Sequence, residues 1–141
     1  MRTRVYNNKE QVFCEWRHRW VRLTPEEWVR QQLLHRLVEQ LGFPASLIAV
    51  EVPLKPSNLQ TFKRADAVVY DASMTPLMII ECKAETVPLT QKTLDQAVTY
   101  NRQLNVPWLV LHNGPQTICA HITKEGTTFL KTIPPYSFLT I

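Results

Sequence analysis

The sequence has few cysteines and few glycines, and it has no long apolar run. Its three cysteines, Cys14, Cys82 and Cys119, are widely spaced and odd in number, which excludes a disulfide framework and a paired-cysteine metal site. With three glycines it has no glycine-rich phosphate loop. No apolar stretch approaches the roughly 20 residues that span a bilayer, and no apolar signal-peptide segment follows the basic N-terminus. We therefore expect a cytoplasmic protein without a membrane anchor.

The composition is that of a folded globular protein. Apolar residues make up 45% and charged residues 20% of the 141 residues. The four histidines show no spacing typical of a zinc site. The length suits one domain with one core. Within it we expect a basic strand or hairpin segment over 1–23, a core over 24–125 and a C-terminal extension over 126–141.

Positive charge is concentrated in the first 36 residues. This stretch has eight basic and four acidic residues, and its surplus of four positive charges equals the net charge of the chain. A basic N-terminal face suits a polyanion such as nucleic acid, although a solvated, solubilising surface has the same composition. Between Phe13 and Arg22, aromatic and apolar residues alternate with arginines. This pattern favours a strand pair or hairpin and is compatible with contacts to nucleic acid.

Two amphipathic helices are predicted, each with a start signal. Thr24 as N-cap, a proline in the first turn and Glu27 at the third position of a capping box predict a helix that ends at Gly42. Its apolar stripe consists of Leu33, Leu34, Leu37, Val38 and Leu41. The second helix covers about 90–104, with Thr90 as N-cap. Its apolar stripe consists of Leu94, Ala97, Val98 and Leu104.

Strand-like segments lie between the helices and after them. They cover about 47–54, 62–70, 76–82, 106–112, 117–123 and 127–133. A helical crossover between two strands of one sheet makes that pair parallel. We therefore predict an α/β (α+β) fold, in which helices flank a mixed central β-sheet in the order αβββαβ.

The residues that suggest chemistry lie on two of these strands. Asp66 lies in the strand 62–70, and Glu81, Cys82 and Lys83 directly end the apolar run of the next strand. Because strand side chains alternate, Glu81 and Lys83 share a face and Cys82 points to the other, into the core. If the strands are neighbours, Asp66 lies beside Glu81, and a hard divalent cation relieves the repulsion between their carboxylates. Lys83 would then orient a metal-bound water or stabilise charge on a phosphate.

Four stretches of the chain, in this order and spacing, resemble the PD-(D/E)xK nuclease superfamily. They are Leu23–Gln31, Arg64–Asp71, Ile79–Ala84 and Asp95–Asn101. An acid or a lysine at a strand end is by itself usually a solvated charge, but the whole set is far more specific than any member. Within the superfamily, the likeness is to the N-terminal nuclease domain of the type I restriction enzyme R subunit (HsdR), and it covers about residues 12–125. Ala65 stands where the superfamily's name has proline, and 141 residues do not accommodate a helicase motor.

The resemblance implies a restriction-endonuclease-like core and a Mg²⁺-dependent nuclease that hydrolyses DNA, with Mn²⁺ able to replace Mg²⁺. It implies that Asp66, Glu81 and the backbone carbonyl of Cys82 bind the metal, and that Lys83 is the catalytic lysine.

Further site residues come from the same resemblance. Family members often have a glutamate of the first helix at the site, where it would contact the metal directly or through water. Glu26 is the preferred candidate because it falls within the apolar stripe on a helical wheel, whereas Glu27 lies nearer the margin and has the capping role. Capping alone remains the alternative for both. Gln96 and Tyr100, four residues apart and so on one helix face, match a Gln-x-x-x-Tyr motif that flanks the site.

Four basic residues are candidates for binding DNA phosphates: Arg64, Lys63, Arg30 and Arg19. A plain surface charge is the alternative for each. Two other functions stay open: a catalytically silent module of the same fold that binds nucleic acid or a protein, and a structure-selective nuclease, such as a junction resolvase, that acts as a dimer. The expected partner is DNA and not a membrane, with a homodimer or a larger restriction or repair assembly left open.

Overall fold

The computed structural model describes residues 1–54 and 63–140, which form two sheets and the helices beside them. The strands of the first sheet are β1 (Thr3–Tyr6), β2 (Lys9–Cys14) and β3 (Arg19–Arg22). Those of the large sheet are β4 (Ile48–Leu54), β5 (Lys63–Tyr70), β6 (Pro76–Cys82), β7 (Trp108–His112), β8 (Thr117–Thr123) and β9 (Gly126–Leu130). The helices are α1 (Pro25–Leu41), the short 3-10 helix η1 (Ala45–Leu47), α2 (Gln91–Leu104) and α3 (Tyr136–Leu139).

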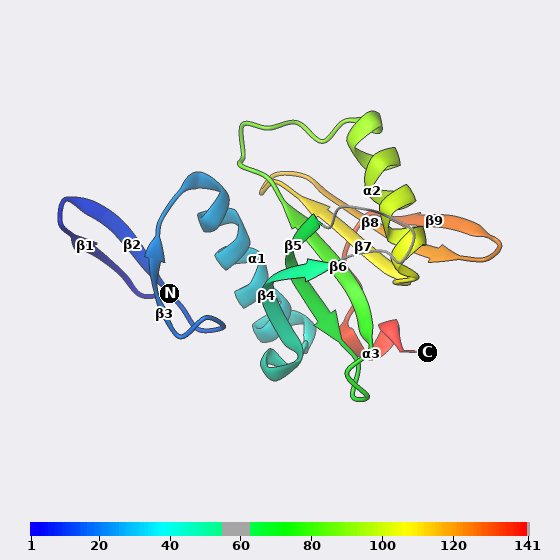
Figure 1. Ribbon diagram of the computed structural model, residues 1–141, viewed down its shortest axis with the longest axis horizontal. Coiled ribbons are helices and arrows are strands. Elements are labelled where there is room, and N and C mark those ends of the chain that lie inside the picture. The colour runs from blue at the N-terminus through cyan, green and yellow to red at the C-terminus, as the bar shows by residue number, and fades with distance from the viewer. Residues whose placement is uncertain (55–62, 141) are drawn as a thin grey trace.

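The large sheet is mixed, as predicted. Among the described residues its strands follow in the order β4-β5-β6-β7-β8-β9. β6 and β7 are parallel, because α2 connects them, and the other neighbours are antiparallel. Figure 1 shows the first sheet extending away from the large one, with α1 between them. Over the described part of the chain, no helix combines the length and apolar character that crossing a bilayer requires.

The first sheet confirms the predicted strand pair and adds a strand. β2 and β3 pair antiparallel, and β1 pairs with the other edge of β2. The turn between β1 and β2 consists of Asn7 and Asn8, both with positive φ (50° and 63°), as a two-residue hairpin turn of type I′ requires. β1 escaped prediction because its four residues are all exposed, so no buried face marks it.

Helix α1 begins and ends where its capping residues predict. The Thr24 side chain accepts a hydrogen bond from the backbone nitrogen of Glu27 at 3.1 Å, and Gly42 closes the helix in the left-handed conformation with φ 72°. In a capping box the glutamate side chain would accept a hydrogen bond from the backbone nitrogen of Thr24. The Glu27 carboxylate instead pairs with Arg17 and Arg30. The predicted apolar stripe is confirmed, since all five of its residues pack in one core cluster.

Replacement of the cap should destabilise the protein modestly. We expect Thr24→Ala to lower the free energy of unfolding by about 1 kcal/mol, because a backbone N–H of the first turn loses its acceptor. Thr24→Ser keeps the oxygen and should lose much less. Urea unfolding of the three proteins measures the difference, and equal midpoints for Thr24→Ala and the parent would contradict it.

The core lies on both faces of the large sheet. On one face, Leu34 and Leu37 of α1 pack with Met78 and Ile80 of β6. On the other, the buried residues of α2 pack with Ile79 and its neighbours, which confirms the apolar stripe predicted for that helix. Residues 126–139 are part of the large sheet and its core, because β9 pairs with β8 and the Trp108 indole donates to the Leu139 carbonyl at 3.3 Å.

Candidate active site

Strands β5 and β6, which carry the candidate acids, are neighbours in the large sheet. The two strands are antiparallel neighbours, with Ala67 opposite Ile80, so Asp66 and Glu81 come next along them. The backbone nitrogen of Cys82 donates to Oδ2 of Asp66 at 2.7 Å. The expectation that the two strands are neighbours is therefore confirmed, and the Asp66 carboxylate contacts the very segment that carries Glu81 and Lys83.

Strand β5 is irregular at Asp66. Ala67 packs in the core on the α1 side and Ala65 in the core on the α2 side, although residues two apart in a regular strand share a face. At the same level of the neighbouring strand β4, Glu51 has a φ of 57°, which L-residues rarely adopt. At this irregular position the Asp66 carboxylate accepts its hydrogen bond from the backbone of β6.

The thiol of Cys82 points into the core, as predicted. Cys82 is 1% exposed and packs on the α1 side, so Glu81 alternates to the other side of β6. Burial raises the pKa of the Cys82 thiol. The negative charges of Asp66, Glu81 and Glu26 also raise it, while that of Arg30 acts in the opposite direction. All four charges therefore lie near Cys82, at the end of β6. The raised pKa keeps the thiol neutral.

Lys83 extends the pairing of β6 with β7 by one residue. Its backbone nitrogen donates to the carbonyl of His112 at 2.8 Å, and its side chain is half-buried. Burial lowers the pKa of His112 to about 4, and the positive charge of Arg36 acts in the same direction. A neutral His112 adds no charge beside Lys83, whose position is set by the backbone of β7.

A buried ion-pair network extends from Asp66 toward the first sheet. Its centre is Glu27, 6% exposed, whose Oε1 lies 2.7 Å from Nη2 of Arg17 and 2.5 Å from Nη2 of Arg30. Gln31 donates to its other oxygen at 3.1 Å. Burial by itself raises the pKa of Glu27, but the hydrogen bonds from Arg30 and Arg17 outweigh it and leave the pKa below its ordinary value. Glu27 is therefore ionised and holds the two arginines in place.

Glu51 is the second centre of this network. Its carboxylate pairs with Arg17 and, at 3.2 Å, with Nη1 of Arg64. Arg30 connects the two centres to the candidate site, because its Nη2 lies 3.6 Å from Glu51 and its Nη1 lies 3.6 Å from Oδ1 of Asp66. Sequence reasoning missed Arg17 and Glu51. The only signal in the sequence was that Glu51 interrupts an otherwise apolar strand, and this signal does not indicate which residues pair with it.

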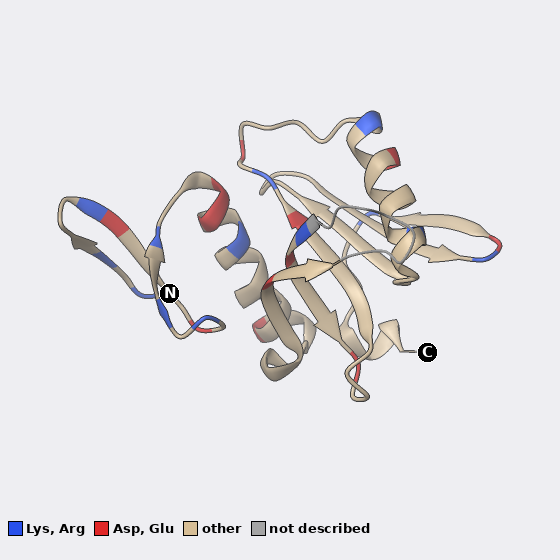
Figure 2. Cartoon of the chain, in the orientation of Figure 1, with Lys and Arg blue, Asp and Glu red and all other residues tan. Residues whose placement is uncertain are grey.

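The network lines a cleft of about 490 Å³ between the first sheet, α1 and the large sheet. We call it the arginine cleft; it is lined by Arg17, Arg19, Trp20, Val21, Arg22, Thr24, Glu27, Arg30, Glu51, Arg64 and Asp66. Figure 2 shows acidic and basic segments following one another from β3 across the start of α1 to β4 and β5. Asp66 is thus open to a cleft whose walls are rich in arginine.

The two candidate glutamates of α1 lie in different surroundings. Glu26 is exposed, although its charge is close enough to raise the pKa of Cys82. Glu27 is buried in the ion-pair network, so the expectation that Glu26 lies within the buried stripe and Glu27 at its margin is wrong. The physical reason is that the first sheet covers α1 on the side of Glu27 and supplies Arg17 as its partner.

The side chains of three of the four predicted phosphate-binding residues are described, and they divide into two groups. Arg64 is 64% exposed and Arg19 is exposed, and both line the arginine cleft. Arg30 is 11% exposed and is held by carboxylates, and its Nη1 also lies 3.4 Å from the carbonyl of Asp66. The side chain of Lys63 lies outside the described residues.

Gln96 and Tyr100 lie together on α2, as their spacing predicts. They line a shallow hollow together with Asp95, Thr99 and Gln103. The Tyr100 hydroxyl donates to the carbonyl of Leu54 at 2.7 Å and so holds α2 against the end of β4. Among the described residues, the lining of this hollow does not include Asp66, Glu81 or Lys83.

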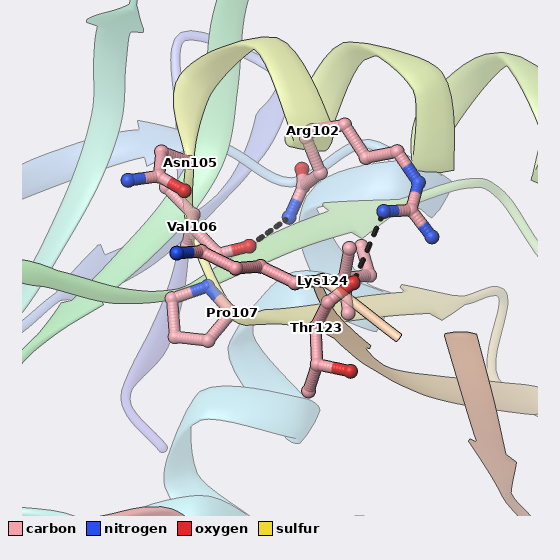
Figure 3. A pocket seen from close by; sticks show the side chains of 8 residues that line it. Arg102, Asn105, Val106, Pro107, Thr123 and Lys124 are labelled. Atoms are coloured by element: carbon pink, nitrogen blue, oxygen red, sulfur yellow. Dashed lines mark hydrogen bonds between the residues drawn. The ribbon is translucent and has the colours of Figure 1, made fainter. Parts of the chain in front are cut away.

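Another hollow lies at the C-terminal end of α2 and has a volume of about 240 Å³ (Figure 3). Arg102 donates to the carbonyl of Thr123 at 3.2 Å across it, and Asn101 donates to the carbonyl of Val106 at 3.4 Å. These bonds connect α2 to β8 and to the start of β7. Because the candidate acids lie at the other end of β6 and β7, this hollow is separate from them.

The donor atoms predicted for the site suit a hard cation with few protein ligands. Within residues 1–54 and 63–140, no group of three histidine, cysteine or acidic side chains is placed to hold a metal ion. The two carboxylates and a backbone carbonyl predicted for the site are all oxygen donors. Mg²⁺ accepts such a set because it keeps several of its waters. The donors predicted for the site are therefore of the type that Mg²⁺ takes.

Comparison with known proteins supports the predicted restriction-endonuclease-like core. Residues 25–134 match the family model described as the type I restriction enzyme R protein N terminus (HSDR_N). A fragment of a candidate HsdR subunit of a type I restriction enzyme from Vibrio vulnificus YJ016 has a similar fold, with a TM-score of 0.58 and 21% identity over 82% of this chain. The match covers 24% of the chain in that fragment structure, so this chain spans about a quarter of its length.

A second solved structure resembles nearly the whole chain. It is a candidate nuclease belonging to DUF820 from Anabaena variabilis ATCC 29413, with a TM-score of 0.54 and 9% identity. The match covers 95% of this chain and 86% of that protein. No curated protein matched the sequence. At these identities the two solved structures establish the fold that the chain shares with them.

Proposed function

We propose that this chain, which belongs to the family of the type I restriction enzyme R protein N terminus, is a nuclease that hydrolyses DNA phosphodiester bonds with Mg²⁺. The observation that carries the proposal is the 2.7 Å hydrogen bond from the Cys82 nitrogen to Oδ2 of Asp66. It places an acid of β5 against the segment of β6 that carries Glu81 and Lys83. These are the residues that the family resemblance assigns to the reaction.

In this proposal, each residue has a distinct task. Asp66, Glu81 and the carbonyl of Cys82 would hold the metal, with Glu26 as a further ligand, directly or through water. A bound Mg²⁺ supplies a Lewis acid for the phosphate and a water of lowered pKa. Lys83 donates to the oxygens on which negative charge develops, in a half-buried position where such a donor acts more strongly than in water.

The arginines around these residues position the DNA and the Asp66 carboxylate. The exposed Arg64 and Arg19 contact phosphates of the DNA in the arginine cleft. Arg30 acts differently, because it is held by Glu27 and contacts Asp66. It balances the charge of the acid and keeps the carboxylate oriented.

The second candidate function is a catalytically silent module that binds nucleic acid or a protein. Two observations favour it. Asp66 already has Cys82 and Arg30 as partners, and the described residues contain no group of three metal-binding side chains. In such a module the ion-pair network would serve the fold alone.

Calorimetric titration with Mg²⁺ or Mn²⁺ separates the two functions. We expect the protein to bind the ion and Asp66→Ala to lose this binding, because one of the two carboxylates is removed. Glu125→Ala, which removes an exposed carboxylate near the turn between β8 and β9, should bind as the parent does. Failure of the parent to bind either ion, even with DNA present, would favour the silent module.

The nuclease function itself is tested by a cleavage screen. The purified protein is incubated with linear, circular, single-stranded and branched DNA in Mg²⁺ or Mn²⁺, beside Glu81→Ala as the inactive control. Cleavage that the control lacks supports the proposal, and the preferred DNA form identifies the substrate. Absence of cleavage from every DNA with both ions would overturn it.

A further inference from the structure

The first sheet carries positive charges and aromatic rings on one face. Alternation and the register of β1, β2 and β3 place them together. We call this the basic-aromatic face; it consists of Arg2, Arg4, Lys9, Phe13, Trp20 and Arg22. Glu10, the acid within these three strands, alternates to the opposite face. The basic-aromatic face therefore has charge of one sign.

The opposite face of the sheet is the one that packs on the protein. Val12 and Cys14 of β2 are both fully buried. The Cys14 sulfur accepts from Nε of Arg17 at 3.2 Å, and Gln31 of α1 lies close enough to lower the pKa of the thiol. The basic-aromatic face is therefore turned away from α1, and its four cations are exposed.

The rings on this face hold the arginines in place. The guanidinium carbon of Arg2 lies 4.1 Å from the ring centre of Phe13, and that of Arg4 lies 4.3 Å from the ring centre of Trp20. Nε of Arg4 also donates to Gln11 at 2.7 Å. Stacking and hydrogen bonding order these side chains before any partner arrives, so less entropy is lost when their remaining N–H groups bind an anion.

The same stacking argues against base recognition by the rings. A base can stack on an aromatic side chain only where the ring is open. Here guanidinium groups cover Phe13 and Trp20. The charges, and not the rings, are thus presented to a partner. A partner that matches several exposed cations of one sign is a polyanion with closely spaced charges.

The basic-aromatic face meets the arginine cleft along β3, an edge strand of the first sheet. Trp20 and Arg22 belong to it and also line the arginine cleft, at whose other side Asp66 lies. A long polyanion that lies on the first sheet can therefore extend into the cleft. A double-stranded DNA fits this description, because it carries one negative charge per about 1.7 Å of its axis.

We propose that the basic-aromatic face docks double-stranded DNA through its backbone phosphates and directs it along β3 into the arginine cleft. The direction of the DNA rests on the proposed nuclease function, but the docking does not require cleavage. Arg2 and Arg4 bind phosphates as pre-ordered donors, and the contact is independent of base sequence.

The test is the affinity for a fluorescent DNA duplex without divalent ions, measured by anisotropy over a range of salt concentrations. We expect Arg2→Ala/Arg4→Ala to weaken binding by about tenfold or more, and to reduce the slope of log affinity against log salt by about two, since each phosphate contact contributes roughly one. Lys124→Ala/Lys131→Ala removes two exposed charges elsewhere and should keep both values of the parent. Arg2→Gln/Arg4→Gln, with longer side chains, repeats the test if the alanine variant unfolds.

Two results would overturn the docking. One is an unchanged salt slope in both arginine variants. The other is tighter binding of single-stranded DNA, with Trp20→Leu costing more affinity than loss of the two arginines, which would mean that bases stack on this face. Because binding is measured without cleavage, a protein that docks duplex DNA and never cuts it refutes the nuclease function alone.

Discussion

Lys83→Ala is expected to lower the rate of DNA cleavage by at least about a hundredfold, the usual effect of removing one donor to a developing charge. The structure explains why this should be an effect on chemistry and not on folding. The backbone of Lys83 is held by its 2.8 Å hydrogen bond to His112, which the substitution leaves in place. The side chain is half-buried and lies beyond the strand, next to the segment that Asp66 contacts.

Steady-state cleavage of the preferred DNA, with the unfolding midpoint measured in parallel, checks this expectation. Lys131→Ala removes an exposed lysine of the C-terminal segment and serves as the matched control. Lys83→Arg keeps the charge but replaces a compact ammonium by a planar group, so it should recover only part of the activity. A Lys83→Ala protein that cleaves as fast as the parent would exclude the proposed mechanism.

Glu27→Ala is expected to destabilise the protein by about 3–5 kcal/mol, as removal of one partner of a buried ion pair does. Glu27 is 6% exposed, and its two partners Arg17 and Arg30 are 12% and 11% exposed. Without the carboxylate, two guanidinium groups remain close together in a poorly hydrated place. Glu51 can compensate only part of this charge, since it also pairs with Arg64.

The neighbouring glutamate provides the control for this second prediction. Glu26 is exposed, and Glu26→Ala should change the free energy of unfolding by no more than about 0.5 kcal/mol. Urea unfolding at neutral pH compares the two variants. If Glu27→Ala unfolded at the same urea concentration as Glu26→Ala, the network would have no structural importance.

The same network predicts a dependence of stability on pH. The pKa of Glu27 is lower in the folded protein than its ordinary value of 4.5, despite burial, because Arg30 and Arg17 donate to it. A lowered acid pKa stabilises the folded state above the unfolded value, and this stabilisation is lost as pH falls through the folded value. The parent should therefore lose stability below about pH 4.5 more steeply than Glu27→Ala.

Much of the fold was predictable because its signals are local. The cap at Thr24, the glycine at position 42 and the periodicity of the leucines between them depend on residues close in sequence. The parallel pair β6 and β7 followed from the helix between them. The neighbourhood of Asp66 and Glu81 was predictable for a related reason, since consecutive strands usually pair.

The partners of the charged side chains were not predictable in this way. Arg17, Glu27, Glu51 and Asp66 come from the turn between β2 and β3, from α1, from β4 and from β5, and only packing brings them together. The pattern on α1 favoured Glu26 as the inward residue, because a helical wheel does not show that the first sheet covers the side of Glu27. The positive φ of Glu51 likewise has no signal in the sequence.

The sequence by itself determined most of the elements, their order and the two strands that lead to Asp66, Glu81 and Lys83, because alternation and helical period are properties of neighbouring residues. Only the tertiary structure decided that Arg30 is held by carboxylates, that Glu27 is buried, and that the cations of the first sheet share one outward face. The physical reason is that the free energy of a charge depends on its burial and on the charges a few ångströms away, which residues distant in sequence supply.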